Sequence, residues 1–144
     1  MRGIKLKPSD IAFSKCIRAA NNHTCEKCGA YRPPTGMRGS NGMECSHVFT
    51  RTHRTIRWCK DNAQCLCTSC HAWYGGNPAD SGVWIEGIRG EGSMAILREK
   101  RGSMIKVSKA EEKEIARHYR QELKIIDEKR LQGATGYIDF ESWQ

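Results

Sequence analysis

Residues 44–78 read ECSHVFTRTHRTIRWCKDNAQCLCTSCHAWYGGNP and contain one CxxC pair, Cys67 and Cys70. A second pair, Cys25 and Cys28, lies upstream, with 38 residues between the two pairs. Each pair places two thiolates on one tight turn, and four thiolates complete the tetrahedral coordination of Zn²⁺. The spacing therefore predicts a structural zinc ion that joins two distant segments of the chain. The alternative is thiol redox chemistry at the CxxC pairs, which predicts no tightly bound zinc.

The other four cysteines are expected in the interior. Cys16 lies on an apolar helical stripe, and Cys45, Cys59 and Cys65 are assigned to a small sheet. The chain begins MRGIKLKPSD, without an apolar signal core, and no apolar run approaches the roughly 18–20 residues that span a bilayer. Eight cysteines without an export signal favour metal binding over disulfides. We therefore expect a cytoplasmic protein with no membrane partner.

The charge is concentrated in the first part of the chain. The 144 residues carry 24 Lys and Arg against 16 Asp and Glu, a net charge of +8. Residues 1–62 hold 12 basic and 4 acidic side chains, whereas residues 63–144 hold 12 of each. The excess predicts an anionic partner such as nucleic acid, bound by the first 62 residues.

Apolar spacing and turn residues predict the local structure of the first 78 residues. A helix is expected over 9–20, with Ser9 as its N-cap, and Asn41-Gly42 signals a tight turn. A strand is predicted from Met43 to Thr50, with Ile56–Trp58 as its antiparallel partner. A short helix begins at the second CxxC pair and is stopped by Gly75-Gly76-Asn77-Pro78.

The second part of the chain is predicted to be helical. Residues 79–107 are weakly amphipathic, with a helix expected over Met94–Lys100. Ser108 and Glu111 form a capping box for a longer helix over 109–132. We therefore divide the chain into a core over 1–78 and a helical extension over 79–144, which packs on the core or on a partner subunit.

The order of residues between and after the cysteine pairs resembles that of a known enzyme family. Cys45-Ser46-His47-Val48-Phe49 is followed by Asp61-Asn62, and His71 follows Cys70 directly. Over residues 25–78 the chain is similar to HNH endonucleases of the His-Me finger (ββα-metal) superfamily, and most similar to the phage NinG-like recombination type. The resemblance implies an α+β fold: a zinc-stapled, treble-clef-like ββα-metal core with flanking N-terminal and C-terminal helices.

The resemblance also implies a reaction. His47 would be the general base that activates water, Asn62 would help to orient His47, and His71 would bind a divalent cation such as Mg²⁺. The implied activity is DNA phosphodiester hydrolysis that leaves 5′-phosphate and 3′-hydroxyl ends. The NinG-like type further implies phage recombination on branched DNA in the host-cell cytoplasm. Paired cuts would need two active sites, so we expect a homodimer, formed through the C-terminal helix.

The chain departs from the common HNH pattern at Ser46. Many HNH proteins have Asp before the base, as a second metal ligand, and a serine hydroxyl is a poorer cation ligand than a carboxylate. Either Ser46 binds the cation weakly and more waters remain, or Glu44, His53 or the DNA supplies a ligand. The departure keeps two alternatives open: a catalytically silent zinc-containing module that binds DNA, and an RNA-directed binder or nuclease.

Basic residues near His47 are predicted to bind phosphates. Arg51, Arg54 and Arg57 recur at every third position, and Lys60 follows. Arginine suits bidentate phosphate contact, so these four side chains form the expected DNA-binding surface. Four more basic residues would extend it over the first helix: Lys5, Lys7, Lys15 and Arg18. His23 and His118 lie outside the HNH pattern, and we assign them no role.

Overall fold

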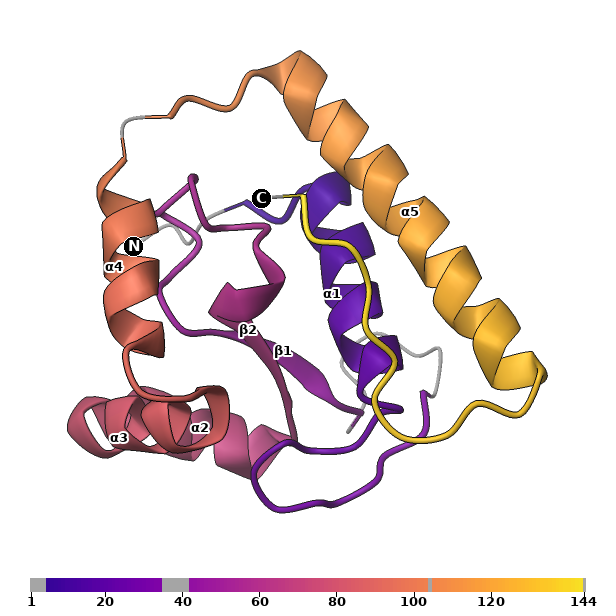
Figure 1. Ribbon diagram of the computed structural model, residues 1–144, viewed down its shortest axis with the longest axis horizontal. Helices are drawn as coiled ribbons and strands as arrows, with labels where there is room; N and C mark the ends of the chain where they lie inside the picture. The colour runs from indigo at the N-terminus through magenta and orange to yellow at the C-terminus, as the bar shows by residue number, and fades with distance from the viewer. Residues whose placement is uncertain (1–4, 35–41, 104, 144) are drawn as a thin grey trace.

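A two-stranded antiparallel sheet, β1 (Glu44–His47) and β2 (Ala63–Leu66), lies at the centre of the computed structural model. The structure describes residues 5–34, 42–103 and 105–143, so Asn41 of the predicted turn lies outside the described residues. The sheet is surrounded by helices, which makes the fold α+β, as predicted (Figure 1). These are α1 (Pro8–Ala20), η1 (Lys60–Asn62, a 3-10 helix), α2 (Thr68–Gly76), α3 (Pro78–Arg89), α4 (Ser93–Gly102) and α5 (Lys109–Leu131).

The predicted strand pairing is wrong. β1 ends at His47 instead of Thr50, and it pairs with residues 63–66 instead of Ile56–Trp58. Ile56–Trp58 does not pair with β1 because the side chain of Asn62 holds the segment between the two strands in a loop. Its Oδ1 accepts from Phe49 N at 2.8 Å, and its Nδ2 donates to Phe49 O at 2.9 Å and to Ile56 O at 3.2 Å. The backbone at Phe49 and Ile56 is thereby satisfied without a strand partner.

Helix α1 begins at Pro8, one residue before the predicted start, and Asp10 caps its first turn where Ser9 was predicted to do so. The backbone N–H of Lys7 donates to Asp10 Oδ2 at 2.8 Å, whereas Ser9 is buried inside the helix. A proline at the first helical position has no N–H that the helix could use, so this start costs no hydrogen bond.

Helix α5 lies alongside α1, and together they bury the apolar stripe predicted for the long helix (Figure 1). The rings of Phe13 and Tyr119 meet edge to face with centroids 5.0 Å apart. The hydroxyl of Tyr119 donates to Trp58 O and accepts from Trp143 N, so the C-terminal tail packs over the same junction. Burial of each such large side chain contributes about 2 kcal/mol. The apolar stripe of α5 is therefore buried by contacts within this chain.

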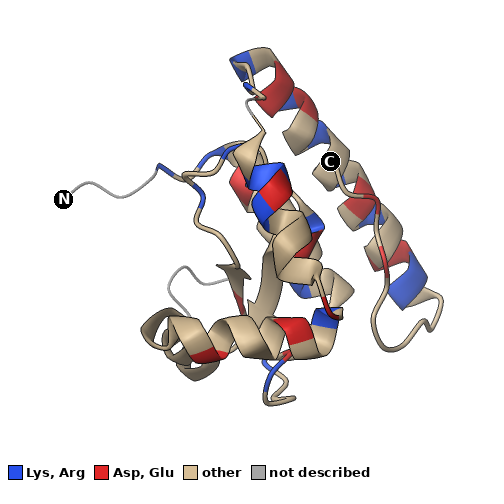
Figure 2. Cartoon of the chain, turned by 60° about the vertical axis from the view of Figure 1, so that its left-hand side comes forward, with Lys and Arg blue, Asp and Glu red and all other residues tan. Residues whose placement is uncertain are grey.

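One hydrophobic core crosses the boundary drawn at residue 78. It contains Phe13 and Ile17 from α1, Leu66 from β2, and Ile115 from α5. The exposed residues of α5 are mostly polar, apart from Ile125 and Leu131, and Figure 2 shows basic and acidic residues intermixed along the helix. Helix α5 thus packs on α1 and shares one core with the sheet.

Helix α3 falls in the stretch predicted only as weakly amphipathic, without helix bounds, and α4 is longer than the predicted segment over Met94–Lys100. Helix α3 starts directly after α2, and the Ser81 hydroxyl donates to Tyr74 O at 2.7 Å across the corner. The Trp84 ring packs edge to face on Trp73, with centroids 6.2 Å apart. Among the described residues, no helix is both long and apolar enough to cross a membrane.

Candidate functional site

The two CxxC pairs meet at one point, as the sequence predicts. The sulfur atoms of Cys25, Cys28, Cys67 and Cys70 all lie within 4.8 Å of one another, and Cys28 Sγ is 3.7 Å from Cys67 Sγ. A Zn–S bond of about 2.3 Å sets the edge of a regular ZnS₄ tetrahedron at about 3.8 Å. The four side chains can therefore hold a metal ion such as zinc.

The first cysteine turn is also bound to the sheet by its own hydrogen bonds. Glu26 N donates to Cys65 O at 2.9 Å, and Glu26 Oε2 accepts from Cys65 N at 2.6 Å. Burial raises the pKa of Glu26, while the N–H of Cys65 and the charge of Arg89 oppose that rise. Cys67 caps the start of α2. The cysteine cluster thus joins the exit of α1, the sheet and the start of α2.

The remaining cysteines lie where the sequence places them, with two differences. Cys16, Cys59 and Cys65 are buried, and the thiol of Cys16 donates to Tyr119 O at 3.0 Å. Cys45 faces Cys65 across the sheet but is only half-buried, because its side chain lines a cleft. Cys59 precedes η1, so it lies outside the sheet to which it was assigned.

A cleft of about 580 Å³ lies over β1, between α1 and the start of α2. His47 from β1 and His71 from α2 both line it, so the structure brings together the predicted base and the predicted cation ligand. Glu44 and Arg51 line the same cleft. These four side chains come from a stretch of 28 residues that the antiparallel sheet and the cysteine cluster fold back on itself.

His47 is held in one tautomer by the loop that follows it. Its Nε2 lies 3.1 Å from Arg57 O, and because a carbonyl oxygen only accepts, Nε2 carries the hydrogen and Nδ1 keeps its lone pair. Burial lowers the pKa of His47 to about 4, and the charge of Arg51 adds to this effect. The imidazole is therefore neutral at physiological pH.

The lowered pKa predicts an acid-sensitive fold. Unfolded, His47 titrates near its ordinary value of 6.5, so between about pH 6.5 and pH 4 the unfolded chain binds more protons. The free energy of unfolding should fall by about 3 kcal/mol as the pH is lowered through this window. Urea unfolding of His47→Gln should lack that part of the pH dependence. A wild-type-like slope in His47→Gln, or an equal loss of slope in the control His53→Gln, would contradict the assignment.

Asn62 does not line the cleft but lies behind it. Its side chain is fully buried, and its bonds to Phe49 and Ile56 hold the two ends of the loop that carries Arg57. Asn62 therefore affects His47 indirectly. It fixes the backbone next to Arg57, and the carbonyl oxygen of Arg57 accepts the hydrogen bond from the imidazole N–H.

Glu44 lies beside His71 in the cleft, and Ser46 lies outside the cleft. Glu44 Oε1 is 2.7 Å from His71 Nδ1, and Glu44 Oε2 accepts from the Thr68 hydroxyl at 3.1 Å. Ser46 is buried opposite Gln64 in the sheet and does not line the cleft. The suggested role of Ser46 as a ligand is therefore corrected. His53 also lies outside the cleft.

Three of the four predicted phosphate-binding residues have carboxylate partners instead. Arg57 pairs with Asp10 at 2.6 Å, with both side chains buried, so it does not belong to an exposed basic surface. Arg54 pairs with Glu112, and Lys60 pairs with Asp139 at 2.6 Å. Only Arg51 of the four lines the cleft.

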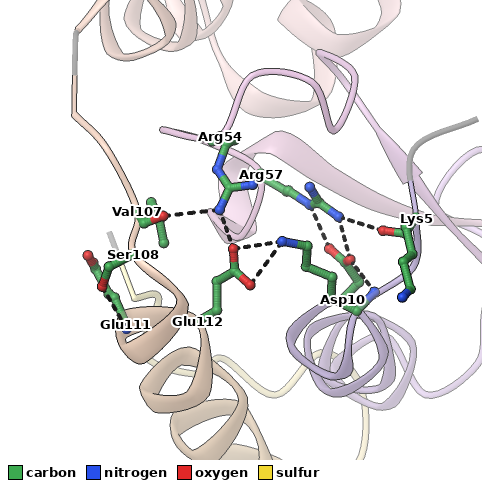
Figure 3. A network of polar contacts seen from close by, with 9 residues as sticks. Lys5, Asp10, Arg54, Arg57, Val107, Ser108, Glu111 and Glu112 are labelled. Atoms are coloured by element: carbon green, nitrogen blue, oxygen red, sulfur yellow. Dashed lines mark hydrogen bonds and ion pairs between the residues drawn. The ribbon is translucent and has the colours of Figure 1, made fainter.

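The buried pair fixes the loop next to His47 (Figure 3). Asp10 accepts from Arg57 Nε at 2.9 Å and from Nη2 at 2.6 Å, and Nη2 also donates to Lys5 O at 3.1 Å. Burial raises the pKa of Asp10, but the Arg57 guanidinium and the Lys7 N–H bring it below its ordinary value. Sequence reasoning missed Asp10. Its only signal is the spacing of Asp10, Ser14 and Arg18, which places three polar residues on one face of α1.

Comparisons of the chain with models of known protein families, with curated proteins and with solved structures find no match. The function of the cleft must therefore be inferred from the chemistry of its residues. Among the residues that the structure describes, the four cysteines are the only set of three or more metal-binding side chains whose ligand atoms lie this close together. Glu44 and His71 form a pair of ligands and not a complete cation cage.

Proposed function

We propose that the chain is a metal-dependent DNA endonuclease of the HNH type, with His47 as its general base. The observation that carries the proposal is the cleft over β1, where a neutral histidine with a free Nδ1 lies beside the Glu44–His71 pair. A base and a cation site in one cleft are the two components that one-metal phosphodiester hydrolysis requires. The basic first part of the chain suits a polyanionic substrate.

His47 would act through Nδ1. The neutral imidazole takes a proton from a water molecule as that water attacks the phosphorus atom, and the imidazolium so formed keeps its Nε2–H bond to Arg57 O. A positioned base of this kind contributes about 10²–10⁴-fold to the rate. The buried Asp10–Arg57 pair and Asn62 keep the carbonyl in place during the step.

Glu44 and His71 would hold the divalent cation. A carboxylate and an imidazole suit Mg²⁺, Mn²⁺ and neighbouring transition ions, which fill their remaining positions with water and phosphate oxygens. When bound, the cation neutralises charge on the phosphate and on the leaving 3′ oxygen. Thr68 orients Glu44 by its 3.1 Å hydrogen bond, so the carboxylate is fixed before a cation binds.

The resemblance to NinG-like proteins extends the proposal to branched DNA and phage recombination in the host-cell cytoplasm. Two coordinated cuts in a junction need two active sites, which a homodimer supplies. The apolar stripe of α5 is buried against α1, so such a dimer would use another surface than the one first expected.

Glu44→Gln tests the cation site directly. We expect this variant to need at least about tenfold more Mg²⁺ or Mn²⁺ for half-maximal cleavage of supercoiled plasmid, because an amide is a weaker ligand than a carboxylate. Its content of zinc, measured by elemental analysis, should equal that of the wild type. Glu91→Gln, on the exposed turn before α4, is the matched control and should behave as wild type.

Assays of the wild-type protein distinguish the proposed endonuclease from a catalytically silent DNA-binding module. Zinc-loaded protein should be assayed on linear, nicked, flap and four-way DNA with several divalent cations. Cleavage of none of these substrates, together with DNA binding, would overturn the proposed activity in favour of the catalytically silent DNA-binding module.

A further inference from the structure

Two arginines of the cleft form no ion pair with the acidic side chains that the structure describes. Arg18 from α1 and Arg51 from the loop after β1 both line the cleft. Neither side chain forms an ion pair or a hydrogen bond with any other residue that the structure describes. The Nη1 atom of Arg51 is buried and still lacks a hydrogen-bond partner. A buried guanidinium N–H without an acceptor is unfavourable, so this atom calls for an anion from outside the chain.

The balance of charged side chains in the cleft also favours an anionic ligand. The cleft contains two carboxylates, and both are engaged: Asp10 with Arg57 at 2.6 Å, and Glu44 with His71 at 2.7 Å. Neither forms an ion pair with Arg18 or Arg51, although the charge of Arg51 helps to lower the pKa of Asp10. Guanidinium groups bind phosphate oxygens bidentately, and in a recess with reduced solvent access such contacts are stronger than on an open surface.

We propose that Arg18 and Arg51 form a phosphate clamp that binds the sugar-phosphate backbone of a nucleic acid beside His47. The clamp rests on the proposed function in that the bound backbone is the substrate of the same cleft. It places part of the substrate site on α1, outside residues 25–78 that resemble HNH proteins. It also replaces Arg54, Arg57 and Lys60 as the phosphate-binding residues, because those three are held by carboxylates of the chain itself.

The test is DNA binding in the absence of cleavage. A short fluorescein-labelled DNA duplex is titrated with the full-length His47→Ala protein without divalent cations, across a series of salt concentrations. Adding Arg18→Ala or Arg51→Ala should weaken binding about tenfold and lower the slope of log K against log salt by about one. Arg98→Ala removes the same charge from an exposed position on α4 and should change both quantities much less.

Further variants separate the effect of charge from that of geometry and provide a substitute if one variant does not fold. Arg51→Lys keeps the charge but not the bidentate geometry, so its affinity should fall between those of arginine and alanine. If Arg51→Ala unfolds, Arg51→Gln and Arg18→Ala still test the clamp. Unchanged affinity in both clamp variants, or an equal loss in Arg98→Ala, would overturn it. Loss of binding in the clamp variants with no cleavage by the wild type would support the clamp and refute the proposed endonuclease, so the two failures are distinguishable.

Discussion

His47→Ala is expected to lower kcat for plasmid cleavage by about 10²–10⁴-fold, with little change in DNA affinity. The imidazole is held neutral, with its hydrogen directed to a carbonyl and its free lone pair on Nδ1. Removing it takes away proton transfer but leaves the Glu44–His71 pair and both clamp arginines in place. The measurement is single-turnover cleavage at saturating protein, beside DNA binding by fluorescence anisotropy.

Two controls separate a chemical role from a structural one. His53→Ala removes a histidine that lies on the neighbouring loop outside the cleft, and it should cleave as wild type. Added imidazole should restore part of the activity of His47→Ala, because a free base can enter the vacated space. Undiminished cleavage by His47→Ala would refute the assignment. Loss of activity that imidazole does not restore, in a protein with an altered circular dichroism spectrum, would make His47 structural.

Cys67→Ser is expected to abolish both metal binding and folding. Structural zinc sites contribute about 10–16 kcal/mol in zinc-finger peptides, whereas whole domains are stable by only about 5–15 kcal/mol. The two strands of the sheet have four residues each, and a pair of strands is at best marginally stable without further support. Cys67 lies directly before α2, which carries His71, so loss of the metal at this position would disorganise the cleft as well.

The readouts for this variant are elemental analysis and thermal unfolding. Wild type should contain one zinc per chain, and Cys67→Ser should contain none and show no cooperative transition. Cys45→Ser, a half-buried cysteine outside the cluster, should keep the metal and unfold cooperatively. A full zinc content and a wild-type Tm in Cys67→Ser would show that the four cysteines are not the ligands.

The elements that follow local rules were predictable from the sequence. The paired cysteines, the helix at 9–20 and the long helix after Ser108 each depend on spacing or capping within a few residues. The strand pairing was not predictable, because Ile56–Trp58 has the apolar character of a strand, and residues 63–66 have no alternation since all four are buried. The hydrogen bonds of Asn62 to Phe49 and Ile56 decide between these partners, and no local pattern reveals them.

The candidate site was predictable only in part, for a related reason. His47 and His71 belong to a recognisable order of residues, and Glu44 was one of several alternatives for the second ligand. The error concerned the arginines, whose partners are distant in sequence. Asp10 is 47 residues from Arg57, and Glu112 is 58 residues from Arg54. A run of basic residues in the sequence therefore does not establish an exposed basic surface. Carboxylates that are distant in the sequence can pair with those residues in the folded protein.

The shared core of α1, the sheet and α5 limits how this protein can be divided. Residues 25–78 contain both cysteine pairs and both cleft histidines, which makes them look like an exchangeable cassette. Yet Phe13 supports His47 from α1, and the Tyr119 hydroxyl binds Trp58 O beside the carbonyl that holds the base. A graft of the motif into another scaffold would leave that carbonyl unsupported. The loop that carries Arg57 and its flanking helices therefore form a single unit for protein engineering.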